Sequence, residues 1–307
     1  MRENSFDIYH TNGISSAINH LSCSTARRLR KPYIIAPYGM LHDYRPGNRV
    51  TLTRRIYHRI FLNHDLQKAT CLRAISEEEA YNIRRLGFNN PIAYILWPNN
   101  VPSFLDEAIK EGNEWKKQNP DRRRVATIIV EDEYSDLESI IKAFKKVAKK
   151  NDELLLLDFG YSPSTANIKR MVQEQNLGNV RVADSDDYQN SVLLASSCAT
   201  VIPSHHQFMG PVIAQSLLCL TPAICLHHPE WEEVPPMDCG WWCSPLPQSL
   251  ENQISTALMM DYELLAEKGR NGRKLILDKY STEVVSNQMI QLYKWLLGEG
   301  PKPSYII

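Results

Sequence analysis

The chain has 307 residues, a length that suits two average domains or one large one. Hydrophobic residues make up 43% of it and charged residues 23%, which is a globular composition and excludes bulk disorder. Lys and Arg together number 35 and equal Asp and Glu, so a dedicated nucleic-acid binder is not expected.

Signals for membrane insertion, export and disulfide formation are weak. No run of ~18 apolar residues is present, so no segment is expected to span a bilayer. The first residues contain no apolar signal region, and seven cysteines are an odd number in a chain too long for a disulfide scaffold. We therefore expect a cytoplasmic protein with reduced thiols.

Charge is distributed unevenly along the chain. Residues 1–102 contain 14 Lys and Arg against 7 Asp and Glu, whereas residues 103–307 contain 21 against 28. A basic first part suits an anionic membrane surface or an acidic substrate, and we expect a peripheral position at the inner face of the membrane. The alternative is a drift in composition between solvated faces.

Short apolar segments alternate with amphipathic ones, which predicts an α/β fold with parallel strands. Ser76 is a suitable N-cap, and Glu79 completes a capping box. The predicted strands of the first hundred residues are 7–10, 32–36, 70–75 and 92–96. The predicted helices are 14–30, 49–68 and one that begins at 76, and the predicted turns are 11–13 and 37–39.

Residues 99–122 are polar, contain Pro102, Gly112 and Pro120, and lack a clear period, which is typical of a linker. Beyond them the alternation restarts. The predicted strands are 124–130, 153–158, 179–182, 199–202 and 222–226. The predicted helices are 135–150, 163–176, 186–196, 210–220 and a tail at 247–297 that breaks at Tyr280-Ser281.

This alternation predicts two Rossmann-like units with parallel sheets and a helical C-terminal tail. The predicted boundaries are a partial N-terminal domain at 1–100, a linker at 101–122 and a C-terminal domain at 123–280. The helix at 281–307 is expected to pack back toward the first domain.

The loop that follows the predicted strand 199–202 is the most informative candidate for a ligand site. It runs from Pro203 to Pro211 and feeds a helix that carries Gln215. A glycine near a helix N-terminus, here Gly210, lets a phosphate approach free backbone N–H groups. Gln207 and Gln215 can hydrogen-bond sugar hydroxyls. The alternative is an ordinary loop-to-helix junction that binds nothing.

Several segments, in order and correctly spaced, resemble the retaining glycosyltransferases of family 4 (group 1), which have the GT-B fold. Pro203, Ser204 and Gly210 fit the family's Pro-Ser-x-x-Glu-x-Phe-Gly pattern. Cys239-Gly240-Trp241-Trp242 fits its Cys-Gly-Trp-Trp segment. The other matching segments are 31–41, 74–79, 98–101, 228–233 and 288–295.

The resemblance implies transfer of a hexosyl group, with retention of configuration, from a nucleotide sugar to a polysaccharide or glycolipid acceptor. It implies no metal and no other cofactor. The C-terminal domain would hold the donor and the N-terminal domain the saccharide or lipid-linked acceptor. The donor-binding residues it implies are Ser204, Gln207, Gly210 and Gln215. It implies His10 as the catalytic residue, and on the acceptor side Asn12, Gly13, Tyr38 and Gly39.

The chain also departs from the family pattern. The family's two glutamates are Gln207 and Gln215 here, and the arginine of its Pro-Arg-Gly loop is Tyr38. The family segment whose cations neutralise the donor diphosphate aligns here with Ile129-Val130 and Ser135-Asp136, and the acidic residues 131–133 between them add three negative charges. The second hypothesis is therefore a catalytically inactive relative that acts as a binding or scaffold module.

The first domain is short for the family, because the glycine-rich strand–helix unit that normally precedes the segment at 7–13 is absent. We expect an N-terminally truncated first domain. Its sheet would then have an unpaired edge, which invites pairing with another chain. Three explanations stay open: a fragment, a start assigned too late, or a dimer or partner that completes the sheet.

Overall fold

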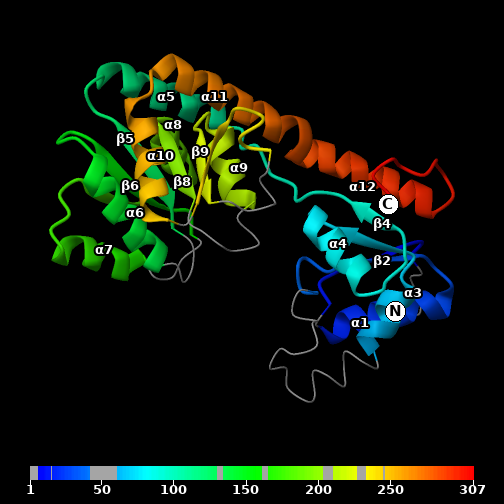
Figure 1. Ribbon diagram of the computed structural model, residues 1–307. Coiled ribbons are helices and arrows are strands. Elements are labelled where there is room, and N and C mark those ends of the chain that lie inside the picture. The colour runs from blue at the N-terminus through cyan, green and yellow to red at the C-terminus, as the bar shows by residue number, and fades with distance from the viewer. Residues whose placement is uncertain are drawn as a thin grey trace. The chain divides into compact units, whose positions relative to one another are not determined.

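The computed structural model describes residues 6–14, 16–41, 61–129, 134–160, 165–202, 210–226, 233–244 and 246–307. The chain divides into two compact units (Figure 1). The first consists of Met1–Pro98 and Thr282–Ile307, and the second consists of Asn99–Ser281.

The sheet of the first unit has four strands in the described residues, all parallel and in the order β1-β2-β3-β4. The strands are β1 (Tyr9–Asn12), β2 (Tyr33–Ala36), β3 (Cys71–Ala74) and β4 (Ile92–Tyr94). Because all four run in one direction, their carboxyl ends meet at one edge.

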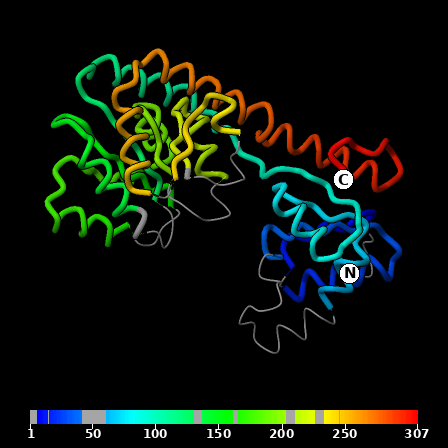
Figure 2. Tube along the Cα trace, viewed as in Figure 1, coloured from blue at the N-terminus to red at the C-terminus, as the bar shows by residue number. Residues whose placement is uncertain are grey.

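Helices cover both faces of this sheet. Helices α1 (Ala17–Leu29), α3 (Asn63–Lys68) and α4 (Glu77–Arg85) lie on one face, where Cys23, Leu66, Leu72 and Ile83 share a buried core. Helix α12 (Thr282–Leu296) covers the other face through a second core. The last residues return to the sheet, where Ile306 pairs antiparallel with Ala93 of β4 (Figure 2).

The start of α4 is predicted correctly. Ser76 has extended backbone angles, and its Oγ accepts a hydrogen bond from the Glu79 N–H at 3.1 Å. The Glu79 carboxylate reaches back to the N–H of Ile75 at 2.9 Å, one residue before the N-cap.

The second unit contains a parallel six-stranded sheet in the order β10-β9-β8-β5-β6-β7. Its first three strands are β5 (Arg124–Ile128), β6 (Glu153–Asp158) and β7 (Val180–Asp184). The others are β8 (Ala199–Ile202), β9 (Ala223–Leu226) and β10 (Gly240–Cys243). This is the strand order of the dinucleotide-binding Rossmann fold, which reverses direction between β5 and β8.

Helices again lie on both faces. Helices α6 (Tyr134–Val147), α7 (Thr165–Glu174) and α10 (Pro247–Met259) share one buried core with the sheet. Helices α8 (Asp187–Ala195) and α9 (Gly210–Leu218) pack against β6, β8 and β9. Helix α11 (Tyr262–Leu275) packs on α9. The predicted α/β class with two parallel sheets and a helical C-terminal segment is confirmed.

The segment expected to be a linker is largely helical. Helix α5 (Leu105–Gln118) lies in it and packs on α8 within the second unit. The glycine taken as a linker signal serves this packing, because a Cβ at Gly112 would lie 2.6 Å from the Cβ of Ala195. The linker prediction at 101–122 is therefore corrected to a helix of the second unit.

Two further elements differ from the expected ones. Strand β10 was not predicted, and its first residue is a glycine because a Cβ at Gly240 would lie 2.1 Å from the Ala223 carbonyl oxygen. The predicted break at Tyr280-Ser281 is present: a π-helical turn η4 (Ile276–Tyr280) ends there, and Ser281 is extended. Residues 42–60, which include most of the predicted basic helix, lie outside the described residues.

Candidate functional site

The carboxyl edge of the first sheet brings together side chains that are far apart in sequence. Successive residues of a strand point to opposite faces, and His10 of β1 and Arg73 of β3 both lie on the face covered by α12. There Tyr293 of α12 hydrogen-bonds His10 and acts electrostatically on Arg73. Tyr38, from the turn after β2, joins them through a hydrogen bond to Arg73.

His10 is positioned by α12. Its Nδ1 lies 2.8 Å from the Tyr293 Oη, while its Nε2 is buried without a hydrogen-bond partner in the described part of the chain. Burial, and secondarily the charge of Arg73, lower the pKa of His10 from 6.5 to about 4. The imidazole is therefore neutral at pH 7 and has one ring nitrogen available for a further hydrogen bond.

Asn12 and Tyr38 form one hydrogen-bonded unit on the acceptor side. The Tyr38 hydroxyl donates to the Asn12 Oδ1 at 2.9 Å and accepts from the Arg73 Nη1 at 3.2 Å. The Tyr38 ring also meets Trp97 edge to face, with 5.2 Å between the ring centroids. Asn12 is exposed and Trp97 is 40% exposed, so this unit forms an accessible rim.

The two glycines of the predicted acceptor side have left-handed backbones, with φ of 79° at Gly13 and 75° at Gly39. Only glycine adopts such angles without a steric penalty. Tyr38 is also left-handed, at φ 52°, which is unusual for a bulky residue. Glu79 holds the turn, because its Oε1 accepts the Gly39 N–H at 2.6 Å.

Arg73 was missed by the sequence analysis. It is only 6% exposed, and its guanidinium donates to the carbonyl oxygens of Ile95 and Leu96 at 3.3 and 2.9 Å, besides the Tyr38 hydroxyl. The signal that could have found it is an arginine inside a predicted buried strand, because arginine is almost never fully buried without a partner.

A second candidate site lies at the carboxyl edge of the second sheet. The strand order reverses between β5 and β8, and ligands of open parallel sheets bind outside the carboxyl ends of the strands at such a point. Helix α9 follows β8 and begins at Gly210, and the half-buried Gln215 lies on the same helix. Ser204, Gln207 and the acidic residues 131–133 lie outside the described residues.

Three further observations concern metal ligands, membrane-spanning helices and cysteine thiols. In the described ranges, no group of three or more His, Cys, Asp or Glu is placed to hold a metal ion. Among the helices described, none is long and apolar enough to cross a bilayer. All seven cysteines are buried free thiols, and burial raises the pKa of Cys219 to about 12.

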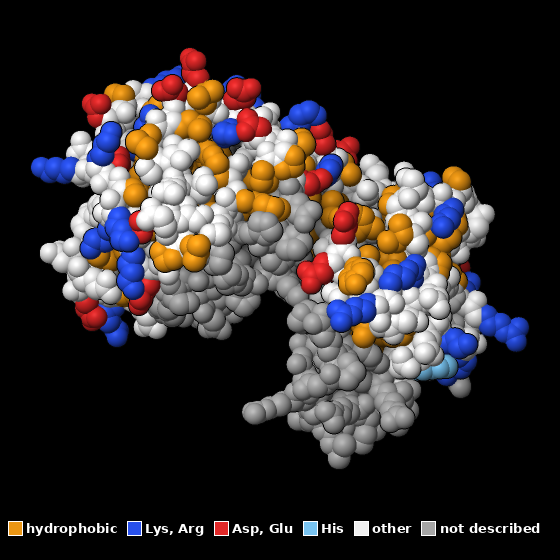
Figure 3. All heavy atoms as spheres, in the orientation of Figure 1, with side chains coloured by type: hydrophobic (Ala, Val, Ile, Leu, Met, Phe, Trp, Pro, Cys, Tyr) orange, Lys and Arg blue, Asp and Glu red, His pale blue; other side chains and the backbone are white. Residues whose placement is uncertain are grey.

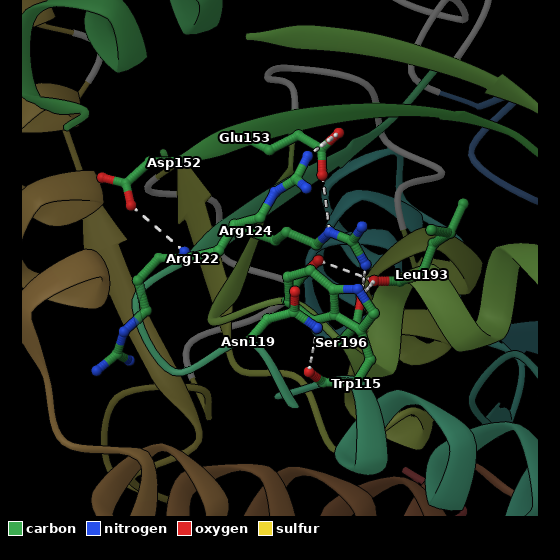
Figure 4. Close-up of polar contacts among 10 residues, drawn as sticks. Trp115, Asn119, Arg122, Arg124, Asp152, Glu153, Leu193 and Ser196 are labelled. Atoms are coloured by element: carbon green, nitrogen blue, oxygen red, sulfur yellow. Dashed lines mark hydrogen bonds and ion pairs between the residues drawn. The ribbon is translucent and has the colours of Figure 1, made fainter. Parts of the chain in front are cut away.

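The opposite, amino edge of the second sheet has a cluster of its own (Figure 4). Arg124 at the start of β5 is 6% exposed, and its Nε lies 2.8 Å from the Glu153 Oε2. Its Nη1 donates to the Ser196 Oγ at 2.9 Å, and its guanidinium carbon lies 3.4 Å from the centroid of the Trp115 ring. Glu153 also pairs with Arg122 at 3.3 Å.

Known proteins share both the sequence pattern and the fold. The family model of glycosyl transferases group 1 matches residues 110–275, more than half of the chain. No curated protein matches. Sucrose-phosphate synthase from Thermosynechococcus elongatus superposes with a TM-score of 0.72 at 21% identity, over 97% of this chain and 75% of the synthase.

Two more solved structures agree in fold. HepE from Anabaena, solved in complex with UDP, has a TM-score of 0.70 at 14% identity, over 94% of this chain and 79% of HepE. WaaG, a glycosyltransferase involved in lipopolysaccharide biosynthesis, has a TM-score of 0.62 at 12% identity, over 93% of this chain and 85% of WaaG. The fold is therefore that of the GT-B glycosyltransferases. With the family model matching over more than half of its length, the chain belongs to the group 1 glycosyl transferases.

Proposed function

We propose that this chain transfers a hexosyl group from a nucleotide sugar to a saccharide or lipid-linked acceptor, with retention of configuration. The observation that carries the proposal is the reversal of strand order between β5 and β8, next to the N-terminus of α9. That edge of a Rossmann-like sheet is where a nucleotide binds.

The donor proposed for the second unit is a nucleoside diphosphate sugar. Backbone N–H groups at the start of α9 and the helix dipole favour a diphosphate there. Structures of HepE with UDP and with UDP-glucose support this class of donor. Ser204, Gln207 and Gln215 are the side chains proposed to contact the donor, and Gly210 is proposed to let its phosphates approach the backbone.

The first unit is proposed to hold the acceptor. In the reaction, an acceptor hydroxyl oxygen bonds to the anomeric carbon while the bond from that carbon to the diphosphate breaks, and the hydroxyl proton passes to the leaving diphosphate. Asn12, Gly13, Tyr38 and Gly39 are the proposed acceptor contacts. His10 is proposed to hydrogen-bond the reacting sugar through Nε2, which has no partner in the described residues.

The test is a titration of the whole chain with UDP, GDP and ADP and their sugars, followed by thermal unfolding and by release of the diphosphate. A ligand at about 100 times its Kd stabilises the folded state by about 2.7 kcal/mol. We expect one nucleotide series to stabilise the protein and its sugar to be consumed. The anomeric configuration of the product, read by NMR, tests retention.

A catalytically inactive relative gives a different result in the same experiment. If no nucleotide stabilises the chain and no diphosphate is released, the transferase proposal is wrong. Gln215→Glu restores the family's residue on α9 and is expected to tighten nucleotide binding. Gln173→Glu on α7, an exposed position, adds the same charge and serves as the matched control.

An anionic membrane surface is the further partner that we propose for the first unit. Helix α1 exposes Ile18 and Leu21, which are 69% and 55% accessible, along with Arg28 near its end. On the face drawn in Figure 3, several Lys and Arg side chains lie on the described part of this unit. Such a mixture of apolar and basic groups suits anionic lipids.

Liposome co-sedimentation tests this partner. Binding is expected to require anionic lipid and to fall in the variant Ile18→Gln with Leu21→Gln. The control is Leu264→Gln, which changes a 50% exposed leucine of the second unit. Equal binding to neutral and anionic vesicles would contradict the proposal.

A further inference from the structure

Arg73 is a buried cation without a bound acid. Arg73 is 6% exposed, and no carboxylate of the described residues lies within ion-pair distance of its guanidinium. Burial accordingly lowers the pKa of its guanidinium. A buried charge normally has a paired counter-charge, because removing an ion from water is costly.

The acid that acts on Arg73 electrostatically is Glu79, but its oxygens are already engaged. Glu79 Oε1 accepts the Gly39 N–H at 2.6 Å, and Oε2 accepts the Ile75 N–H at 2.9 Å. Its carboxylate therefore fixes the turn after β2 and the start of α4, and it forms no ion pair with the guanidinium.

The guanidinium also has unused hydrogen-bonding capacity. Arginine carries five N–H donors. Three of those of Arg73 are used, on Ile95 O, Leu96 O and the Tyr38 hydroxyl. The other two have no acceptor among the described residues. A carboxylate or a phosphate matches the geometry of such donors.

Arg73 lies where a ligand would bind and not where a charge would be needed to hold the fold. It lies at the carboxyl edge of a parallel sheet, with its guanidinium carbon 5.7 Å from the centroid of the Tyr38 ring. Asn12 and Trp97 are exposed beside Tyr38. The rim therefore offers an amide and two aromatic rings, which suit a sugar, above a positive charge.

We propose that the carboxyl edge of the first sheet binds saccharides that carry an oxyanion, and that Arg73 is the residue that holds the charged group. The shared chemistry of the ligand is a sugar with either a carboxylate or a phosphate. This inference rests on the proposed function, because it names the class of acceptor for that same transfer.

The test is an NMR titration of the full chain with three saccharides at millimolar concentration: glucose, glucuronate and glucose 6-phosphate. We expect at least one acidic sugar to bind about tenfold more tightly than glucose, since a hydrogen bond to a charged group contributes about 1.5 kcal/mol or more. Which of the two binds decides between carboxylate and phosphate. Equal binding of all three, or of none, overturns the inference.

Variants assign the effect to Arg73. Arg73→Met, which keeps an unbranched stem but removes the guanidinium, is expected to abolish the preference for the acidic sugar, and Arg73→Lys to retain part of it. The matched control is Arg85→Met, an exposed arginine of the same unit with the same change in charge. Loss of the preference in both methionine variants alike would overturn the inference.

Two further measurements keep the result decisive. If Arg73→Met does not fold, the imidazole signals of His10 in the wild type report the same event, because an anion bound at Arg73 raises the pKa of His10. An unchanged pKa in the presence of the acidic sugar would contradict the subsite. UDP is titrated in parallel. If UDP binds but acidic sugars are not preferred, only the inference is overturned. If acidic sugars are preferred but UDP does not bind, only the proposed transfer is overturned.

Discussion

The two sheets each contain an arginine that is 6% exposed, but the two side chains are treated differently. Arg124, at the amino edge of the second sheet, is paired with Glu153 and stacked on Trp115. Arg73, near the carboxyl edge of the first sheet, donates to carbonyl oxygens and a tyrosine hydroxyl and has no acid partner in the described chain. The charge of Arg124, which holds the fold, is neutralised by an acid. The charge of Arg73 has no acid partner in the described chain and is left available where a ligand is expected.

The surrounding elements explain this difference. Arg124 joins β5 to β6 through Glu153, to the end of α8 through Ser196, and to α5 through Trp115. Each of these partners belongs to the core architecture. Arg73 instead joins the ends of β2 and β4, where the loops of a parallel sheet form binding sites.

Replacing Arg124 is expected to cause the largest loss of stability. Arg124→Met leaves the Glu153 carboxylate, 10% exposed, with the half-exposed Arg122 as its one ion-pair partner among the residues that the structure describes. Breaking a buried ion pair costs about 3 kcal/mol or more. Urea unfolding should show this loss, and adding Glu153→Met should recover at least half of it. A loss below about 1 kcal/mol would mean that the pair does not hold the fold.

The pH dependence of stability is expected to be the second effect. Because the folded pKa of His10, about 4, lies below its ordinary 6.5, the unfolded chain binds the proton first. Stability is therefore complete above pH ~6.5 and falls as the pH drops toward 4, by up to about 3 kcal/mol. The measurement is the difference in unfolding free energy between wild type and His10→Gln across this range. A difference that does not change with pH would contradict the depressed pKa.

Arg73→Met is expected to cost less stability than Arg124→Met, about 1 kcal/mol. No carboxylate is left without its ion pair, and the loss of hydrogen bonds to Ile95 and Leu96 is offset by removal of a buried charge. The same variant should raise the pKa of His10, because Arg73 is the second cause of its depression. A destabilisation equal to that of Arg124→Met would remove the distinction between the two arginines.

Tyr38→Phe is expected to have the smallest effect on stability, below about 1 kcal/mol. It removes the hydroxyl that accepts from Arg73 and donates to Asn12 but keeps the ring that contacts Trp97. The expected consequence is a higher KM for the acceptor with little change in kcat, since Asn12 loses a fixed orientation. Steady-state kinetics with Asn19→Ala, a neighbour whose side chain donates to the Asn12 backbone carbonyl and not to its side chain, provide the comparison. An unchanged KM would exclude this role of Tyr38.

The alternation of apolar segments predicted most of the strands and helices, and the N-cap at Ser76 was correct to the residue. Helix α5 was missed because Gly112, Pro102 and Pro120 look like loop signals. Its glycine is required instead by close contact with Ala195, which lies 83 residues further along the chain. Contacts over such separations leave no local pattern.

Contacts between residues far apart in sequence also limit what could be predicted of the candidate site. Asn12, Tyr38 and the two glycines were found because they lie in short motifs, and the structure brings Asn12 and Tyr38 into contact. Arg73 lies in no matching segment, and Tyr293, although inside the matching segment 288–295, reaches His10 over 283 residues. Of the predicted donor residues, Gly210 and Gln215 lie on α9, and the others lie outside the described residues.

We propose that the carboxyl edges of the two sheets, and not their amino edges, bind the substrates. Backbone amide NMR during a UDP titration tests it most directly. We predict that the amides at the start of α9, from Gly210 onward, shift with a single affinity while those of Arg124 and Glu153 do not. Shifts confined to the Arg124 cluster, or none at α9 while UDP binds, would contradict the account.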